Sequence, residues 1–500
     1  MDFANLHLSL SNILPEISIA VFLMLVVIFD LISHENKKLI PYISLIGLLI
    51  TGFIVIIKMG ITDSAFAVPS MNAGGMVAVD PFSSYFKLVI ILTSIIVIFF
   101  SMSSKEIKDI YKRSGEYYAL IFGMILGMML MVSAVDLILI YLSVELLSLS
   151  SYVLAGFTKL RDRNSEASLK YIIYGSASSG IMLFGISVLY GLTGTTNLFE
   201  INSALQTTQI NVFTLSFSII LIFVGLGFKL SAVPFHFWTP DVYEGAPLPI
   251  TAYLSVASKA AALALLIRFI HSTFVSYVND NGFWEMITVF DWQTLLIVIS
   301  LFTMTLGNLT ALWQKNLKRL LAYSSIAHAG YLILGLAVLS NAGISAVMLY
   351  FLAYLFMNLG AFYVIMLISN DNYKENINDI NGLGFSSPLL AVPLSIFLVS
   401  LAGIPPTFGF VAKLNLFAAV IDANLITVVI IALLNTVVSV YYYSRLLKHM
   451  YFNKSEDTVT PIKVNKMDSA IVFILAGLVV FFGIFFNNII EFVKNSAQLL

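Results

Sequence analysis

The chain has 500 residues, of which 59% are hydrophobic and 11% are charged. Soluble domains carry roughly 25% charged residues, so this composition excludes a water-soluble globular protein and predicts a membrane protein. The formal net charge of −1 gives no sign of a surface for nucleic acid. The absence of cysteine excludes iron–sulfur clusters, disulfides and thiol catalysis within the chain.

Hydrophobic runs long enough to cross a bilayer, roughly 20 residues each, recur along the whole sequence. Alternating segments of about 10 residues, typical of an outer-membrane barrel, are not found. We therefore predict an all-α polytopic membrane protein with about 14 transmembrane helices. The predicted spans are residues 11–32, 40–58, 81–101, 116–133, 135–157, 168–191, 212–233, 249–270, 294–312, 319–338, 343–369, 388–421, 424–445 and 468–490.

Basic residues are unequally divided between the two sides of these spans. With the N-terminus outside, 19 of the 26 lysines and arginines fall in cytoplasmic loops. These are Lys37, Lys38, Lys105, Lys108, Lys112, Arg113, Lys159, Arg161, Arg163, Lys170, Lys315, Lys318, Arg319, Lys374, Arg445, Lys448, Lys454, Lys463 and Lys466. The positive-inside rule then predicts a bacterial inner-membrane protein with both termini on the periplasmic side.

Four basic residues fall on the outer side, namely Lys58, Lys87, Arg268 and Lys494. Long basic side chains near the end of a span can reach water with their charged group. We expect Lys58, Lys87 and Arg268 to do so at the membrane interface, without a further function.

Two predicted spans, the seventh and the twelfth, are interrupted by proline. Pro234 lies in LGFKLSAVPFHFW, and Pro405 and Pro406 lie in AGIPPTFGFVAKLNLF. Proline removes backbone hydrogen bonds where no water can replace them. The two segments are five spans apart, so they cross the membrane in opposite directions. This pattern predicts two inverted five-helix repeats, spans 4–8 and 9–13, each with a broken helix.

The predicted repeats divide the chain into four parts. Residues 1–115 form a three-helix segment, residues 116–272 the first repeat and residues 290–448 the second repeat. Residues 449–500 form a cytoplasmic loop and the last span.

Charged residues inside the apolar spans are the strongest functional signal. Lys229, Lys259 and Lys413 each lie within a span, and Glu145 lies in the middle of LILIYLSVELLSLSSYVL. An ionised side chain at the bilayer centre costs at least about 2.5–3.5 kcal/mol, so it needs a partner or a wet cavity. We expect Glu145 to be the partner of Lys229, because a carboxylate that moves changes the proton affinity of a buried lysine.

His328 lies at the centre of its span among hydroxyl side chains, in LLAYSSIAHAGYLILG. Imidazole can take up and release a proton near neutral pH. We interpret Glu145, Lys229, Lys259, His328 and Lys413 as a relay for protons, with His328 joining the two halves and Lys413 at the end. The structural alternative is that the charges merely pair with each other and that His328 is satisfied by hydroxyl groups in a helix contact.

Four stretches carry a family resemblance: VELLSLSSYVLAGF, FKLSAVPFHFWTPDVYEGAP, LKRLLAYSSIAHAGY and AGIPPTFGFVAKLNLF. They are similar to the antiporter-like subunits of proton-pumping NADH:quinone oxidoreductase, complex I, over essentially all predicted spans. The subunit N branch is favoured because Lys413 stands where subunit M has glutamate. The end at Leu500 favours it too, because subunit L continues into a long lateral helix.

The resemblance implies a membrane-arm subunit of a proton-translocating oxidoreductase, with Glu145 and Lys229 as the coupled pair and Lys259 and His328 on the connecting axis. It also implies that flavin, iron–sulfur clusters and quinone belong to partner subunits, and that this chain holds no cofactor, metal or redox centre. The expected partners are other membrane-arm subunits, especially neighbouring antiporter-like and small membrane subunits, with lipid, water and protons.

Two alternatives stay open. One is a subunit of a multisubunit cation/proton antiporter without electron transfer, and the other is a scaffold that transports nothing. NADH as the donor is inherited from the family, and other donors are possible.

Overall fold

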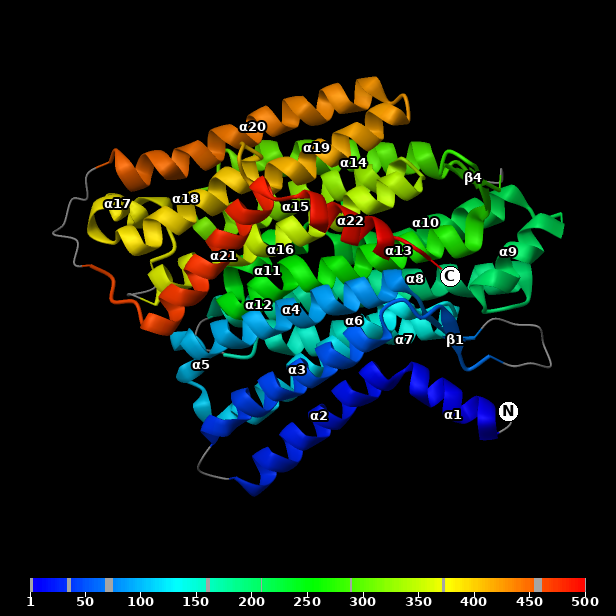
Figure 1. Cartoon of the computed structure of the whole chain (residues 1–500), viewed down its shortest axis with the longest axis horizontal. Coiled ribbons are helices and arrows are strands. Elements are labelled where there is room, and N and C mark those ends of the chain that lie inside the picture. The colour runs from blue at the N-terminus through cyan, green and yellow to red at the C-terminus, as the bar shows by residue number, and fades with distance from the viewer. Residues whose placement is uncertain are drawn as a thin grey trace.

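A computed structural model describes residues 3–33, 37–67, 75–158, 162–207, 209–287, 290–370, 374–453 and 461–499. The predicted cytoplasmic residues Lys159, Arg161 and Lys454 lie outside these ranges. The described chain is a bundle of helices, as predicted (Figure 1). Two antiparallel hairpins accompany it: β1 (Asp63–Ala65) with β2 (Val77–Val79), and β3 (Val275–Val278) with β4 (Trp284–Met286).

Among the described residues, 13 helices are long and apolar enough to cross a membrane, or up to 14 if the bent pair Ile377–Ser386 and Pro388–Ala402 makes one span. The helices at the predicted spans are α2 (Leu14–Ile32), α3 (Ile40–Lys58), α4 (Pro81–Ser103), α6 (Ser114–Ser133), α7 (Leu137–Ala155), α8 (Asp162–Thr193), α10 (Val212–Leu230), α12 (Leu248–Tyr253) with α13 (Lys259–Phe274), α14 (Trp292–Ala311), α15 (Leu317–Ala337), α16 (Asn341–Ser369), α18 (Pro388–Ala402) with α19 (Phe408–Asp422), α20 (Ile426–Tyr451) and α21 (Lys466–Ile484). The remaining α-helices are α1 (Phe3–Asn12), α5 (Lys105–Lys108), α9 (Leu198–Thr207), α11 (Trp238–Gly245), α17 (Leu383–Ser386) and α22 (Asn487–Ser496).

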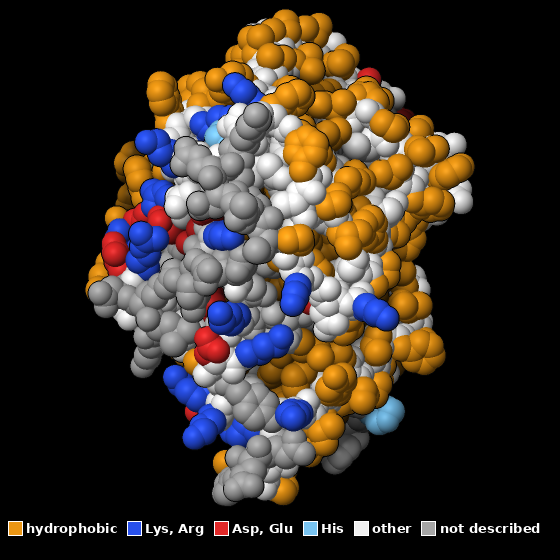
Figure 2. All heavy atoms as spheres, turned by 90° about the vertical axis from the view of Figure 1, so that its left-hand side faces the viewer, with side chains coloured by type: hydrophobic (Ala, Val, Ile, Leu, Met, Phe, Trp, Pro, Cys, Tyr) orange, Lys and Arg blue, Asp and Glu red, His pale blue; other side chains and the backbone are white. Residues whose placement is uncertain are grey.

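The two ends of the bundle differ in charge. Helix α1 and the last described residues lie at the right-hand end in Figure 1, and α5 with Lys105 and Lys108 lies at the left-hand end. Figure 2 looks onto that left-hand end, where many lysine and arginine side chains gather beside an apolar surface. We call it the basic end. It lies opposite the termini, as the sequence-based orientation requires.

Both proline-containing segments separate two half-helices. Helix α10 ends at Leu230 and α11 begins at Trp238, with Pro234 between them. Helix α18 ends at Ala402 and α19 begins at Phe408, after Pro405 and Pro406. Helices α18 and α19 have 15 residues each, too few to cross about 30 Å of hydrocarbon alone. The span predicted over residues 388–421 therefore consists of these two shorter helices.

The same capping arrangement occurs at the second helix of each predicted repeat. Asp136 accepts hydrogen bonds from the first turn of α7 and forms a β-bridge with Asn197, which follows α8. Asn316 accepts hydrogen bonds from the first turn of α15 and forms a β-bridge with Asn376, which follows α16. Five spans separate the two caps, so they lie at opposite ends of the bundle.

The sequence-based expectation that Arg268 reaches water is wrong. Arg268 is 0% exposed, because its guanidinium donates to both oxygens of Asp80 (2.8 and 2.9 Å) and to the Val132 carbonyl (2.9 Å). Asp80 also caps α4 through the Ser83 amide. Lys87 is buried as well, in an ion pair with Glu16 at 2.7 Å. These pairs fix α4 against α13 and α2 inside the protein.

Arg268→Met should destabilise the chain by about 3–5 kcal/mol, because it leaves the Asp80 carboxylate buried without its cation. Unfolding of the purified protein in detergent measures this change. Glu116→Ala is the control: it removes a partner of the exposed Arg113–Glu116 pair and should change stability by no more than about 1 kcal/mol. Equal effects of the two substitutions would contradict the structural role of Arg268.

Candidate functional site

Lys229 lies in the last turn of α10, directly before the break, and is 2% exposed. Its Nζ faces the rings of Tyr152, Tyr171 and Phe228 at 5.4, 5.6 and 5.8 Å from their centroids. Among the described residues Nζ has no hydrogen-bond partner. Aromatic faces attract a cation, but a buried amine still needs a hydrogen-bonding partner, and water is the small group that can supply it.

Glu145 lies on α7 and is partly exposed on the surface of the isolated chain. The Ser179 hydroxyl of α8 donates to its Oε1. Glu145 is close enough to Lys229 to act on it electrostatically, yet the two form no ion pair within 4.0 Å in the described structure. The structure therefore places the predicted partners near each other but holds them apart.

Lys259 occupies a special position in its span. One π-helical turn, η4 (Leu254–Ser258), interrupts the run from α12 to α13, and Lys259 follows it directly. Such turns are rare and frequently mark functional sites. Lys259 is 1% exposed, and its Nζ donates to the Ser325 hydroxyl at 2.7 Å and to the Ser325 carbonyl at 3.1 Å on α15. Lys259 thus joins the first half of the chain to the second.

His328 lies one turn further along α15 and bonds to two tyrosines. Its Nδ1 is 2.8 Å from the Tyr350 hydroxyl, and its Nε2 is 3.3 Å from the Tyr443 hydroxyl. Tyr443 also bonds to Ser324. The predicted hydroxyl environment is present, but the nearest partners of the imidazole are tyrosines of α16 and α20.

Helix α16 supplies polar residues that the sequence analysis missed. Tyr350 bonds to His328, the Tyr354 ring lies 5.0 Å from the His328 ring, and Asn358 donates to Ser255 at 2.7 Å. These three residues recur every four positions, so they share one face of α16. The Tyr354 hydroxyl and the Asn358 carbonyl oxygen are buried without a described partner. The spacing Tyr-x3-Tyr-x3-Asn in an apolar span was the available signal.

Lys413 closes the second helix break. Its Nζ donates to the carbonyls of Leu401 and Ala402, at 3.1 and 3.0 Å, which end α18. It also lies 5.2 Å from the centroid of the Tyr331 ring. A cation at a helix C-terminus stabilises the free carbonyls and their negative dipole end. Lys229 also lies at the C-terminal end of a first half-helix, so each break places a lysine at the same kind of helix end.

Gly403 allows this closure for two reasons. Its φ of +83° is left-handed, a conformation that L side chains rarely adopt. A Cβ at this position would lie 2.7 Å from Cδ of Lys413. The absence of a side chain at Gly403 therefore leaves room for the Lys413 side chain to reach the carbonyls of α18.

An ion-pair network at the basic end of the bundle connects helices α8, α11 and α15. Asp241 of α11 pairs with Lys170 of α8 at 2.6 Å and with Arg319 of α15 at 2.7 Å, and Arg319 also pairs with Glu244 at 2.9 Å. Burial favours a higher pKa for Asp241, but the hydrogen bonds from Lys170 and Arg319 outweigh it, and the pKa is lowered. The network fixes the position of α11, the helix that follows the break after α10.

Aromatic stacking continues from this network to Lys229. The Trp238 ring of α11 stacks on Tyr171 of α8, with centroids 4.5 Å apart and planes at 13°. Its indole N–H donates to the Phe228 carbonyl at 2.9 Å. Tyr171 is also one of the rings around Lys229. Helix α11 therefore helps to determine the surroundings of the lysine.

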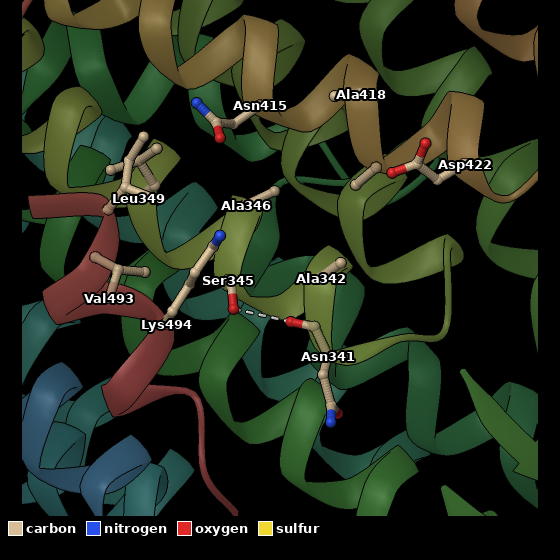
Figure 3. A pocket seen from close by; sticks show the side chains of 12 residues that line it. Asn341, Ala342, Ser345, Ala346, Leu349, Asn415, Ala418, Asp422, Val493 and Lys494 are labelled. Carbon is tan, nitrogen blue, oxygen red and sulfur yellow. Dashed lines mark hydrogen bonds between the residues drawn. The ribbon is translucent and has the colours of Figure 1, made fainter. Parts of the chain in front are cut away.

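A groove of about 420 Å³ lies away from these residues, between α16, α19 and α22. Figure 3 shows the Lys494 side chain of α22 extending into the groove past Ser345 of α16, with Asn415 and Asp422 on α19 at the opposite wall. Lys413 is not among the residues that line it. Within the described residues, no group of three His, Cys, Asp or Glu side chains is arranged to hold a metal ion.

The structure thus places the five predicted residues in two groups. His328 lies on α15, and Lys259 bonds to Ser325 of the same helix. The ammonium group of Lys413 lies beside the ring of Tyr331, which is also on α15. Lys229 lies among aromatic rings of α7, α8 and α10, with Glu145 nearby. The sequence analysis did not include Tyr350, Tyr354 and Tyr443, which contact His328, or Asn358, which bonds to Ser255.

Comparison with known proteins decides the family. The family described as "NADH:quinone oxidoreductase/Mrp antiporter, TM" matches residues 134–439. NADH-quinone oxidoreductase subunit N 2 of Chloroherpeton thalassium is 45% identical over 98% of this chain and 95% of its own length. The chain belongs to the NADH-quinone oxidoreductase subunit N family.

Solved structures agree with this assignment. A chain of respiratory complex I from Thermus thermophilus is 30% identical, with a TM-score of 0.78 over 95% of this chain and 98% of that chain. A chain of the Mrp complex from Dietzia sp. is 20% identical, with a TM-score of 0.80 over 98% of this chain and 97% of that chain. The second likeness shows only that the fold is shared.

Gly403→Ala should destabilise the subunit N chain by at least about 1–2 kcal/mol, because the new Cβ needs a left-handed backbone and displaces Lys413. Thermal unfolding in detergent measures the loss. Gly477→Ala is the matched control, since Gly477 also lies in a span and a Cβ added there would have no neighbouring atom within 4 Å. A Gly403→Ala protein as stable as Gly477→Ala would contradict this account of the break.

Asp241→Asn should remove a pH-dependent part of the stability. Because the pKa of Asp241 is lowered in the folded state, its contribution is fully present above the pKa of a free carboxyl group, about 3.9. The contribution is lost as the pH falls below that value toward the folded-state pKa. The stability difference between wild type and variant, expected to be about 1 kcal/mol or less for partly exposed ions, should therefore shrink below pH ~4. Unfolding curves at several pH values test this, and a constant difference would refute it.

Proposed function

We propose that the chain translocates protons through Glu145, Lys229, Lys259, His328 and Lys413, driven by quinone reduction in partner subunits. Membership of the subunit N family makes it a membrane-arm subunit of NADH-quinone oxidoreductase. The observation that carries the proposal is the set of contacts on α15. Ser325 accepts a hydrogen bond from Lys259, and His328 follows one turn later. Lys259 and His328 are both buried where neither lipid nor bulk water can solvate them.

The unpartnered polar atoms support water-assisted transfer along this path. Nζ of Lys229, the Tyr354 hydroxyl and the Asn358 carbonyl oxygen are buried without a described partner. Unsatisfied buried polar groups commonly bind internal water, and water can pass protons between groups too far apart for direct contact. Tyr350 and Tyr443 flank His328, so a proton reaching the imidazole has a hydroxyl group on either side.

The gap between Glu145 and Lys229 supports a moving carboxylate. An ion pair at this position would hold the lysine charged, whereas the observed separation leaves its proton more easily released. We infer that Glu145 alternates between the Ser179 hydroxyl and a position closer to Lys229.

The exposure of Glu145 supports a partner subunit on this face. Beside Ser179, the small residues Ser176, Ala177 and Gly180 of α8 are exposed or nearly so on the isolated chain. Small residues allow close approach of another transmembrane helix, and a carboxylate facing lipid is costly. We infer that a helix from a neighbouring membrane-arm subunit covers Glu145.

We also propose the arrangement in the cell. The basic end would face the cytoplasm of a bacterial inner membrane, with both termini periplasmic, in keeping with the positive-inside rule and the common end of the termini (Figure 1). Residues 116–272 and 290–448 would form the two inverted repeats, which the paired caps Asp136 and Asn316 support. Flavin, iron–sulfur clusters and quinone would belong to partner subunits.

Lys229→Ala should lower proton translocation by the assembled complex by roughly 10²-fold, the smaller effect expected for loss of a positioned proton-transfer group. Proton uptake and quinone reduction are measured together in membrane vesicles. Lys38→Ala, at an exposed position in the short 3-10 helix Lys37–Leu39, should behave as wild type. Unchanged translocation by an assembled Lys229→Ala complex would reject the proposal and favour the scaffold alternative.

A further inference from the structure

The groove between α16, α19 and α22 lies outside the proposed path, and its lining combines apolar and charged side chains. The charged residues that line it are Lys494 of α22 and Asp422 of α19, both exposed and on opposite walls (Figure 3). The apolar lining comes from all three helices and consists of Ala342, Ala346, Leu349, Ala418, Ala419, Ile490 and Val493. The groove is therefore suited to an amphiphilic molecule.

The groove opens at the end of the bundle opposite the basic end. Helix α16 ends at the basic end, where Asn370 accepts a hydrogen bond from the Lys105 amide of α5, so its first residue, Asn341, lies at the other end. Asp422 is the last residue of α19 and directly follows the twelfth predicted span. Asn415 lies two turns, roughly 10 Å, further in. The mouth of the groove is thus at the level of lipid head groups, and its inner part is at the level of acyl chains.

The two charges line one groove without pairing with each other. In the described part of the chain, neither Lys494 nor Asp422 forms an ion pair within 4.0 Å. Asp422 lies at the C-terminal end of α19, whose last turn has no basic residue, and there the helix dipole disfavours a carboxylate. On the same wall the Asn415 amide nitrogen donates to the Val411 carbonyl at 2.9 Å, so its carbonyl oxygen can still accept a hydrogen bond. One wall therefore offers acceptors for a cation, and the other offers an ammonium group for an anion.

The charges of the lining discriminate among phospholipid head groups. One lysine and one aspartate give no net charge, whereas sites for anionic lipids gather several lysines or arginines. An ethanolamine head group carries a phosphate and a primary ammonium joined by a short link, which matches a cation and an anion on opposite walls. The quaternary ammonium of choline cannot donate a hydrogen bond to Asp422 or Asn415. Proteins recognise it with aromatic rings, and the lining of this groove contains none.

We propose that the groove binds one phospholipid with an ethanolamine head group. The phosphate contacts Lys494, the ammonium donates to Asp422 and Asn415, and an acyl chain lies against the apolar lining. Bound in this way, the lipid joins α22 to α16 and α19, and α19 is the half-helix that carries Lys413. The inference does not depend on proton translocation.

Native mass spectrometry of the full chain in detergent tests the proposal. The probe is an equimolar mixture of phosphatidylethanolamine, phosphatidylcholine and phosphatidylglycerol with the same acyl chains. Ala418→Trp fills the groove from an exposed position, so the lipid lost on this substitution is the lipid bound there. We expect phosphatidylethanolamine to make up this loss, about fivefold or more over each of the other two, because hydrogen bonds to charged groups add to weak exposed ion pairs. Equal loss of the three lipids, or no loss, would overturn the proposal.

Substitution of Asp422 tests the head-group contacts directly. Asp422→Asn should lower phosphatidylethanolamine binding about fivefold, and Asp422→Lys should shift the preference to phosphatidylglycerol, because the groove then carries two cations. Glu491→Gln is the matched control, since it removes an exposed carboxylate of α22 that does not line the groove. An unchanged preference in Asp422→Lys would overturn the proposal. If that variant does not fold, Lys494→Met decides, and binding equal to that of Glu491→Gln would be the contrary result.

A cross-link identifies what occupies the groove in the complete complex. The chain has no cysteine, so Ala342→Cys, at the exposed mouth, gives it a single attachment point for a thiol-linked photoreactive group. A cross-link to phospholipid, identified by its mass, is the expected result. A cross-link to a neighbouring subunit in its place would overturn the lipid site and assign the groove to a protein contact.

Discussion

A helix that stops inside a bilayer exposes carbonyl groups that neither lipid nor water can satisfy, and the part of this chain that the structure describes has such ends at α10 and α18. At the end of α18 the ammonium group of Lys413 bonds to the carbonyls of Leu401 and Ala402. At the end of α10 the indole of Trp238 bonds to the Phe228 carbonyl. At α18 the group that satisfies the carbonyls is itself a buried lysine, and at α10 the residue next to the capped Phe228 is the buried Lys229. Structure and proposed chemistry therefore depend on one constraint.

The polar groups between the breaks are held by helices without lipid contact. The spans Leu248–Phe274 and Asn341–Ser369 are fully buried over their apolar windows. Their polar residues, among them Lys259, Tyr350 and Asn358, therefore face protein on every side. The hydrogen bond from Lys259 to Ser325 of α15 connects the first and second halves of the chain, and the contact of His328 with Tyr350 joins α15 to α16 within the second half. The path inferred for protons follows the most enclosed part of the bundle.

The sequence predicted the helices, the breaks and the positions of the buried charges, because apolar length and proline act locally. It could not predict which polar groups meet, since that depends on rotation and tilt of helices far apart in the chain. Arg268 is an example. Its place near the end of a span suggested contact with water, whereas an ion pair with Asp80, 188 residues away in the sequence, keeps it buried. Tyr350, Tyr354 and Asn358 were missed because uncharged polar residues are common in apolar spans.

The burial of α16 over its whole apolar window also bears on how the chain becomes a folded protein. This helix packs against α4 and α12 from earlier in the chain and against α18, α19 and α21 from later in it. Before those neighbours assemble, Asn358 and the tyrosines would face lipid. A fragment that ends after the first repeat would also leave Ser255 and Lys259 without their partners on α15 and α16. The two repeats therefore resemble interlocking halves of one core, and biosynthesis has to finish the second half before the first can reach its final packing.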